Sequence, residues 1–351
     1  MSLFKIQRAK KNSGHTNHRL RRVLWALSLA ISFVGMPIFA LGASYYEGKT
    51  LTIVVGYKPG GGYDRYARLY ARYLTKHIPG SPTIIIQNMP GAGSIIAANH
   101  LYSVAKPDGL TVGTFNNALT TAQLIKVEGI KFDLTKFSWI GSLASDAVIL
   151  TVRSDLPYKT VEDMRKAKEI VVGTTGPGSS THDFPAILKE FTGINFKLVP
   201  GYSSSSDVML AVERKEVDGR AGSYDSIKPF IERGLVRPMI RNRTAAEGIE
   251  KLPVDEELTT SAKGKAIMAI SAVPTKMYRP YVAAPGTPAE IIKILRDAFA
   301  NASRDKQLLA EAKKGKLTID FSPAGEVLKI VREVLSQSPE MAQEIGKYIK
   351  F

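Results

Sequence analysis

Cysteine is absent from this chain of 351 residues. Without cysteine, no disulfide can stabilise the fold, no thiolate can serve as a nucleophile or metal ligand, and no lipid anchor can be attached to an N-terminal cysteine. Stability must therefore come from packing. The composition allows this, because 44% of the residues are hydrophobic and 23% are charged, as in ordinary globular domains.

Histidine is scarce as well, with five residues in the chain. Three of them, His77, His100 and His182, lie outside the N-terminal segment, and their spacing matches no metal site. The glycine run at 60–62 is followed by no Lys-Ser or Lys-Thr pair and does not match the dinucleotide fingerprint. We therefore expect no metal, no nucleotide and no other cofactor.

A serine hydrolase signature is also missing. Ser179, His182 and Asp183 contain the residue types of a catalytic triad, but they are near neighbours in one loop and no Gly-x-Ser-x-Gly elbow accompanies them. We expect no catalytic residue, and a binding protein rather than an enzyme. A secreted enzyme acting on a carboxylate stays open as an alternative, which turnover of the bound acid would reveal.

Acidic residues are absent before Glu47, whereas seven lysines and arginines lie in the first 22 residues. Without these seven charges, the formal charge of +16 falls to +9. The remaining positive charges are scattered rather than arranged in a stripe that would follow phosphates, so we expect no nucleic-acid partner. A mild general attraction for anions is what such a charge implies.

The basic segment is followed by a hydrophobic run at 23–34 and then by glycine, proline and small residues. This order is typical of a secretory signal peptide. We expect residues 1–43 to be the signal peptide, cleaved near Ala40 to Ser44, and the mature protein to be periplasmic. A retained membrane anchor is the alternative, because the run approaches the roughly 20 apolar residues that span a bilayer.

The rest of the chain repeats a unit that consists of a β-branched run, a glycine-rich loop and a helical segment. Strands are expected at 51–55, 83–86 and 110–115, and the pattern restarts with strands at 170–172 and 196–199. Alternating strands and helices predict open sheets, and 351 residues exceed the usual size of a single core. We therefore predict an α/β fold of two lobes, each a mostly parallel sheet flanked by helices.

Four strand-to-helix loops are rich in glycine, serine and threonine. Such loops lie at the carboxyl ends of strands, where ligands collect in open α/β sheets, and the backbone N–H groups at helix N-termini favour an anion. Tight turns need glycine whatever the function, but four such loops in two lobes favour a site that binds a carboxylate. The loops are 59–64, 90–94, 174–181, which precedes a helix expected at 184–191, and 201–207.

Five motifs resemble, in their order along the chain, those of the Bug family, the extracytoplasmic solute receptors of tripartite tricarboxylate transporters. The first reads Tyr-Lys-Pro-Gly-Gly-Gly-Tyr-Asp and the second reads Gln-Asn-Met-Pro-Gly-Ala-Gly-Ser. The resemblance covers nearly the whole mature chain. The motifs occupy residues 57–64, 87–94, 107–109, 176–182 and 284–288.

The resemblance implies a Venus-flytrap fold, the two-lobed type II fold of periplasmic binding proteins, with the ligand between the lobes. Family members hold a carboxylate through backbone amides and water at the loops that match 59–64 and 176–182. We expect a monomeric periplasmic solute-binding protein that captures a small carboxylate-containing metabolite, with the membrane subunits of a tripartite tricarboxylate-type transporter as partners. A ligand-sensing receptor without transport remains an alternative.

The sequence departs from the family pattern at three places, so the identity of the ligand is not implied. Residues 199–203 read Val-Pro-Gly-Tyr-Ser instead of Val-Pro-Tyr-Lys-Gly, Gln87 replaces the usual glutamate, and 221–225 read Ala-Gly-Ser-Tyr-Asp where Phe-Asp and a small residue are usual. Two roles of Asp64 stay open, namely capping a helix and hydrogen bonding to an amino or hydroxyl group of the ligand. The residues expected to bind the ligand are Gly60, Gly61, Asp64, Gly176, Gly178, Ser179, Ser180, His182, Ser203, Tyr224 and Asp225.

We expect the first lobe to comprise residues 44–145 and 273–351 and the second lobe to comprise residues 146–272. The chain should pass between the lobes around 142–148 and around 270–275.

Overall fold

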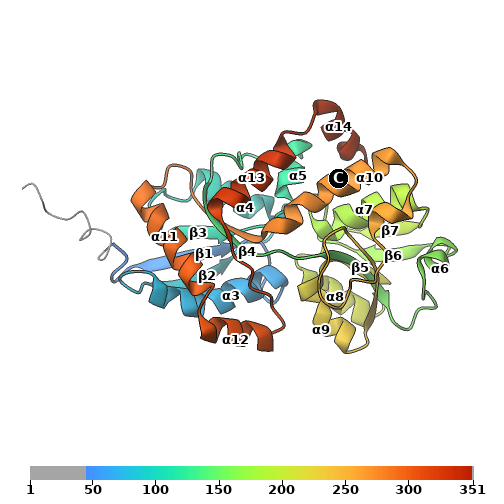
Figure 1. Cartoon of the computed structure of the whole chain (residues 1–351), viewed down its shortest axis with the longest axis horizontal. Helices are drawn as coiled ribbons and strands as arrows, with labels where there is room; N and C mark the ends of the chain where they lie inside the picture. The colour runs from blue at the N-terminus through green and yellow to red at the C-terminus, as the bar shows by residue number, and fades with distance from the viewer. Residues whose placement is uncertain (1–44, 350–351) are drawn as a thin grey trace, which may run out of the picture. The chain divides into compact units, whose positions relative to one another are not determined.

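The computed structural model describes residues 45–349, which form two α/β lobes (Figure 1). The expected signal peptide, 1–43, lies outside the described residues. None of the helices between residues 45 and 349 is long and apolar enough to cross a membrane. We call the lobes the first and the second lobe, after the sheet that each contains.

The first lobe contains a six-stranded sheet with the strand order β11-β4-β10-β3-β1-β2. β1 pairs in parallel with β2 and β3, whereas β10 runs antiparallel to β3 and β4, and β11 runs antiparallel to β4. The strands are β1 Thr50–Val55, β2 Thr83–Asn88, β3 Thr111–Thr114, β4 Ser138–Ala144, β10 Tyr278–Ala283 and β11 Ser322–Pro323.

The second lobe contains a five-stranded sheet with the strand order β7-β6-β8-β5-β9. β6 pairs in parallel with β7 and β8, whereas β5 runs antiparallel to β8 and β9. The strands are β5 Val148–Arg153, β6 Ile170–Gly173, β7 Phe196–Val199, β8 Gly219–Ser223 and β9 Val236–Arg241.

Both sheets are therefore mixed, which corrects the expectation of mostly parallel sheets. The parallel pairs belong to the repeated strand–loop–helix units that the sequence pattern identifies. The antiparallel pairs all involve β4, β5 or β10, the strands that lie next to the connections between the lobes. The prediction of two α/β lobes is confirmed.

Helices flank both sheets (Figure 1). α3 illustrates why they form: its buried residues Tyr63, Tyr66, Tyr70 and Leu74 recur at three- and four-residue spacing, so one face packs into the core. The helices are α3 Gly62–Leu74, α4 Ile95–Ser103, α5 Leu119–Leu124, α6 Val161–Arg165, α7 Ser180–Thr192, α8 Ser205–Glu213, α9 Tyr224–Glu232, α10 Ala262–Ala272, α11 Ala289–Ala302, α12 Lys306–Lys314, α13 Ala324–Leu335 and α14 Pro339–Tyr348. Four short 3-10 helices are η1 Thr75–His77, η2 Ala92–Ser94, η3 Asp255–Leu258 and η4 Val273–Met277.

The chain passes between the two sheets at two places. The first passage is the connection at 145–147 between β4 and β5, and the second leads from α10 through η4 into β10. The backbone N–H of Asp146 donates to the carbonyl of Thr275 (3.1 Å), so the two passages are joined by a hydrogen bond.

The lobe boundaries given above stay a prediction, and α14 complicates them. This helix follows the first-lobe segment in the sequence but contacts α7 of the second lobe. The ring of Tyr348 packs edge-on against that of Phe191, with centroids 5.0 Å apart, and Lys263 of α10 pairs with Glu344 (2.9 Å). The last helix therefore adds a third link between the lobes.

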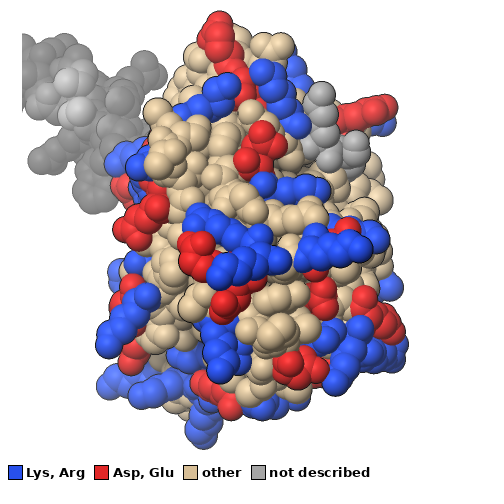
Figure 2. All heavy atoms as spheres, turned by 90° about the vertical axis from the view of Figure 1, so that its right-hand side faces the viewer, with Lys and Arg blue, Asp and Glu red and all other residues tan. Residues whose placement is uncertain are grey.

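Charged side chains of both signs share the surface at the right-hand side of Figure 1. On this face, lysine and arginine side chains lie among aspartate and glutamate side chains (Figure 2). The described surface seen there agrees with the scattered positive charge that the sequence indicates.

Candidate ligand-binding site

A cavity with about 420 Å³ of empty volume lies where the two lobes meet, and we call it the interlobe cavity. It is lined by ends of strands, starts of helices and the first two residues of β10. The first lobe contributes Tyr57, Gly61, Gly62, Tyr63 and Asn116. The second lobe contributes Thr175, Ser180, Thr181, Ser205, Arg220, Ser223 and Ser226, and β10 contributes Tyr278 and Arg279.

Four helices begin at this cavity. Gly62, Ser180 and Ser205 are the first residues of α3, α7 and α8, and Ser223 is the N-cap of α9, with its hydroxyl accepting from the N–H of Ser226. The N-terminus of a helix presents unpaired N–H groups and a partial positive charge of about +0.5. The convergence of four helix N-termini produces a positive electrostatic potential that favours a negatively charged ligand.

Arg279 is the most unusual residue of the cavity. It is only 2% exposed, and its Nη2 donates to the hydroxyl of Ser223 (3.1 Å). Its Nε and Nη1 have no hydrogen-bond acceptor among the described residues. Arg279 also has a φ of +62°, a left-handed conformation that costs roughly 1–2 kcal/mol for a residue other than glycine. Strained backbone of this kind tends to gather at functional sites.

Three tyrosine rings surround this guanidinium. Its central carbon lies 4.4 Å from the ring centroid of Tyr63, 4.9 Å from that of Tyr66 and 4.6 Å from that of Tyr278. Cation–π attraction is stronger where water is excluded, so the rings hold the charge in place without neutralising it. The arginine therefore stays a buried cation.

A second buried arginine, Arg220, lines the same cavity and is also 2% exposed. Unlike Arg279, it has a partner for each nitrogen: Nε donates to its neighbour Ala221, Nη1 to the carbonyl of Ser205 (2.9 Å), and Nη2 to the hydroxyl of Ser226 (3.2 Å). Burial lowers the pKa of Arg220 to about 10, so it remains protonated at neutral pH. The cavity thus contains two buried guanidinium groups.

Asp146 lies behind Ser223, whose hydroxyl donates to its carboxylate. Burial, followed by the nearby charge of Asp225, raises the pKa of Asp146 above its usual range. The serine therefore stands between Arg279 and this carboxyl group, and the two charged groups form no direct ion pair. The polar chain Arg279–Ser223–Asp146 fixes one side of the cavity.

Asp64 stabilises the loop at 59–64, because its carboxylate bonds to groups of the protein. The carboxylate of Asp64 accepts from the N–H of Gly60 (2.8 Å), from Nε of Arg68 (2.9 Å) and from Nδ2 of Asn88 (2.9 Å). Burial alone raises the pKa of Asp64, but these hydrogen bonds hold it below the usual range. Of the predicted residues here, Gly61 lines the cavity, whereas Gly60 is exposed beside it.

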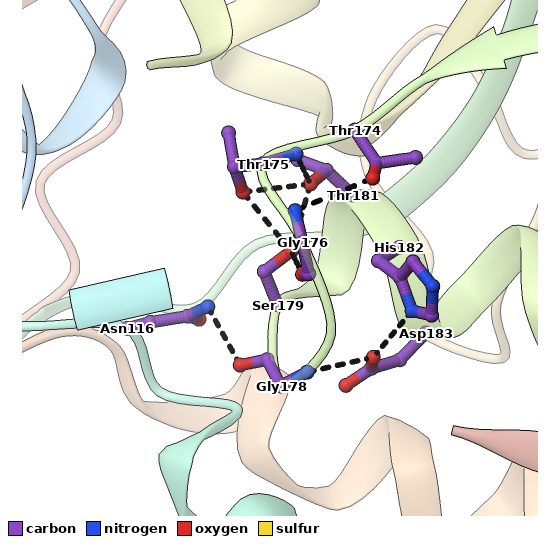
Figure 3. A network of polar contacts seen from close by, with 9 residues as sticks. All are labelled: Asn116, Thr174, Thr175, Gly176, Gly178, Ser179, Thr181, His182 and Asp183. Atoms are coloured by element: carbon purple, nitrogen blue, oxygen red, sulfur yellow. Dashed lines mark hydrogen bonds and ion pairs between the residues drawn. The ribbon is translucent and has the colours of Figure 1, made fainter. Parts of the chain in front are cut away.

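The loop before α7 directs most of its polar groups toward one another (Figure 3). The N–H of Gly178 donates to Asp183 (3.0 Å), and the hydroxyl of Ser179 donates to the carbonyl of Gly176 (2.6 Å). His182 Nδ1 lies 3.2 Å from Asp183 Oδ1, and the ring of His182 lines a separate surface groove. Ser180 is the predicted residue of this loop that reaches the interlobe cavity.

The first lobe also contacts this loop, through Asn116. Its Nδ2 donates to the carbonyl of Gly178 (3.2 Å), and Figure 3 shows this side chain approaching the loop from the other lobe. The hydroxyl groups of Ser180 and Tyr278 lie 3.0 Å apart, which is a second polar contact beside the cavity.

The three remaining predicted residues lie near the cavity but do not line it. Ser203 precedes the cap of α8, and the second residue after it, Ser205, takes the position in the wall. The hydroxyl of Tyr224 donates to the carbonyl of Glu247 (3.1 Å), and its ring belongs to a hydrophobic cluster. Asp225 accepts from the hydroxyl of Tyr66 (2.7 Å) and the N–H of Thr318 (2.9 Å), which joins α9 to the first lobe.

Neither arginine is among the residues that the sequence predicts to bind the ligand. Arg279 lies between Tyr278 and Pro280 in a mostly apolar strand, and Arg220 lies in Gly-Arg-Ala-Gly-Ser, between glycines. A single arginine inside a run of apolar or small residues is a signal in itself, because such residues are rarely buried without a partner. That signal was available without any structure.

A second cavity, of about 510 Å³, lies on the side of α5, α7 and α10. Ser180 borders both cavities. Half of the residues that line this second cavity are apolar, and its charged residues are Asp183 and Asp255. Because both are buried acids, this cavity disfavours an anion, and the interlobe cavity is the better candidate.

Comparison with known proteins identifies the family. The family model described as the tripartite tricarboxylate transporter family receptor matches residues 67–347. A protein of Cupriavidus necator, described as the UPF0065 protein in the gbd 5' region, is 28% identical over 284 residues, which cover 79% of this chain and 81% of that protein.

Solved structures share the fold. The periplasmic binding protein BugD superposes with a TM-score of 0.71 at 19% identity and covers 86% of this chain and 98% of its own. MatC from Rhodopseudomonas palustris, solved with bound malate, superposes with a TM-score of 0.69 at 20% identity and covers 85% of this chain and 99% of its own. The chain therefore has the periplasmic-binding-protein fold, and it belongs to the receptor family of tripartite tricarboxylate transporters, a family of binding proteins and not of enzymes.

Proposed function

We propose that this protein is an exported receptor that captures a small carboxylate-containing metabolite in the interlobe cavity and delivers it to the membrane subunits of a tripartite tricarboxylate-type transporter. The observation that carries the proposal is the cavity itself. Four helix N-termini and a buried arginine with unpartnered nitrogens converge there, so the cavity has donors and positive charge for which the described residues provide no anion.

Two further observations support this reading. A relative of the same fold is described with bound malate, which is a carboxylate. The cavity combines walls from both lobes, so a ligand inside it contacts both and favours their closed arrangement. The closed form is the one that a membrane partner can distinguish from the free receptor.

Export is part of the proposal. The segment 1–43 has the order of a signal peptide, and its removal would leave the mature chain in the periplasm, the compartment from which such transporters take their substrates. Mass spectrometry of the protein from a periplasmic extract tests this directly. A mature N-terminus between Ala40 and Ser44 supports export with cleavage, whereas an intact N-terminus in the membrane fraction supports a retained anchor.

A thermal-shift panel tests the ligand class. A ligand that binds only the folded state stabilises the protein by about 2.7 kcal/mol at a concentration of 100 times its Kd. We expect at least one acid from a set of mono-, di- and tricarboxylates, aromatic acids and amino acids to raise the Tm of the mature protein. A Tm that is unchanged by every acid but shifted by a neutral sugar or a nucleotide would contradict the proposal.

Transport and sensing are separated by the cellular phenotype. With the acid identified, uptake of its radiolabelled form is measured in cells with and without the gene for this receptor. Loss of uptake on deletion supports delivery to a transporter. Uptake that persists while the transcriptional response to the acid is lost supports the sensing receptor instead.

A further inference from the structure

We propose that Arg279 forms a direct ion pair with the carboxylate of the ligand and thereby makes the site select ionised acids over their neutral amides. The inference rests on the proposed function and names the residue that recognises the negative charge of the ligand. The motifs of the sequence imply a different mode, in which backbone amides and water of the loops at 59–64 and 176–182 hold the carboxylate.

Three glycine amides of those loops donate within the protein. The N–H of Gly60 donates to Asp64, the N–H of Gly176 donates to the hydroxyl of Thr174 (3.3 Å), and the N–H of Gly178 donates to Asp183. The hydroxyl of Ser179 is likewise bonded within its own loop. These donors are therefore paired inside the protein, which leaves the first N–H groups of α3 and α7 as the backbone donors of the two loops.

Arg279 adds a positively charged donor to these backbone amides. Its side chain lines the cavity and is almost fully buried, and two of its three nitrogens have no acceptor among residues 45–349. A buried guanidinium with unpaired N–H groups is unfavourable, so an acceptor from outside the chain is strongly favoured. An ionised carboxylate supplies both the acceptor oxygens and the opposite charge.

No acid of the protein competes for this position. Asp146 is separated from Arg279 by Ser223, and Asp225 is bonded to Tyr66 and Thr318. Among the described residues, neither Arg279 nor Arg220 forms an ion pair with a carboxylate, and Arg220 is held by the Ser205 carbonyl and the Ser226 hydroxyl. The cation that remains open to a ligand is therefore Arg279.

The surroundings of Arg279 are shaped around its side chain. A Cβ added at Gly62 would lie 2.6 Å from Nη2 of Arg279 and 3.3 Å from Cβ of Ser226. Only glycine therefore leaves room for the guanidinium at the start of α3. Together with the tyrosine rings and the bond to Ser223, this space sets the guanidinium against the N-terminus of a helix, so the carboxylate can contact both.

The test compares acids with their amides. Calorimetry gives the affinity of the mature protein for four probe pairs of an acid and its neutral amide: succinate and succinamide, adipate and adipamide, butyrate and butyramide, and benzoate and benzamide. For the wild type we expect the best acid to bind roughly 10- to 100-fold more tightly than its amide, the range expected for a hydrogen bond to a charged group. In Arg279→Gln we expect this ratio to fall to within about threefold.

Three further variants distinguish an ion pair between Arg279 and the ligand from a merely structural role of Arg279. Arg279→Lys keeps the charge, and we expect it to retain part of the acid preference. Gly62→Ala keeps every charge but displaces the guanidinium, and we expect it to weaken binding of the acid more than that of the amide. Arg237→Gln removes a partly buried arginine that is bonded to the carbonyl of Tyr158, outside the cavity, and it should keep the wild-type ratio.

Each outcome decides the proposal. An acid preference that survives in folded Arg279→Gln overturns the role of Arg279 and leaves the proposed function standing. If Arg279→Gln does not fold, Gly62→Ala decides, and an unchanged acid-to-amide ratio in that variant overturns the role. If no acid of the thermal-shift panel, these four included, binds the wild type, the failure lies with the proposed function itself, and the inference falls with it.

Discussion

Arg279 and Asp255 are two buried charged residues with opposite consequences for this protein. Arg279 lies at the interlobe cavity and lacks partners for two nitrogens, whereas Asp255 lies in the second cavity and accepts from the N–H of Glu256 (2.9 Å). A buried cation without an anion prepares a binding site. A buried acid without a cation makes the fold sensitive to pH.

Asp255 predicts how stability depends on pH. Burial raises its pKa to about 7, compared with about 4 in an unfolded chain. Since the folded-state pKa is the higher one, the protonated form favours the fold. This stability is complete below about pH 4 and is lost as the pH rises toward 7, by on the order of 2–4 kcal/mol.

We expect Asp255→Asn to remove this part of the pH dependence. The variant should match the wild type near pH 4 and be more stable at pH 8, as measured by urea unfolding across the range. Asp133→Asn is the control, because Asp133 lies at the surface and its pKa is lowered by hydrogen bonds from Thr135 despite some desolvation. Equal slopes for the wild type and Asp255→Asn between pH 4 and 7 would contradict the assignment.

The turns before the helices could be predicted from the sequence, but the hydrogen-bond partners of their residues could not. Glycine and serine at 60–62 and 176–180 indicate turns before helices whatever their contacts. Whether Gly178 N–H points at a ligand or at Asp183 depends on side chains placed by the whole fold. For the same reason, Gly61 and Ser180 reach the interlobe cavity, whereas His182 and Tyr224 do not.

At the scale of elements, the start of α7 shows where local reasoning fails. A helix is expected at 184–191, with Pro185 tolerated in its first turn. The helix begins at Ser180 instead, after Ser179 in an extended conformation, and Pro185 lies inside it. The proline gives up one backbone hydrogen bond, and the packing of Phe184, Ile187 and Leu188 in the core compensates for it.

The contact between α3 and α9 yields a prediction at the same scale. The hydroxyl of Tyr66 on α3 donates to Asp225 on α9 (2.7 Å), and both groups are buried. Tyr66→Phe leaves the carboxylate with one donor fewer in a buried place, so we expect a loss of about 1–3 kcal/mol in the free energy of unfolding. Chemical denaturation of the mature protein measures it.

Tyr73→Phe is the matched control on the same helix. Its hydroxyl bonds to Glu311, whose side chain is exposed, so water can replace the lost partner. We expect a change within about 0.5 kcal/mol. Equal effects of the two substitutions would show that the buried contact between α3 and α9 contributes nothing beyond a surface hydrogen bond.

At the scale of the whole molecule, the two-lobed α/β architecture followed from the periodic pattern, whereas the strand order did not. β10 lies between β3 and β4 although it is more than 130 residues away from β4 in sequence, so its pairing is a long-range property. The link from α14 to α7 is of the same kind, since its helical pattern does not reveal which lobe it covers. Arg279 is placed by these long-range connections, as β10 brings it to the cavity from the passage between the lobes.

Central to the proposed function of this protein is a carboxylate that binds in the interlobe cavity against Arg279. A crystal structure of the mature protein with the acid that raises its Tm most tests it directly. We predict electron density for the carboxylate within hydrogen-bond distance of Arg279 and near the first residues of α3 and α7. Density for the acid in the second cavity or on the surface, with the interlobe cavity holding only water, would contradict the claim.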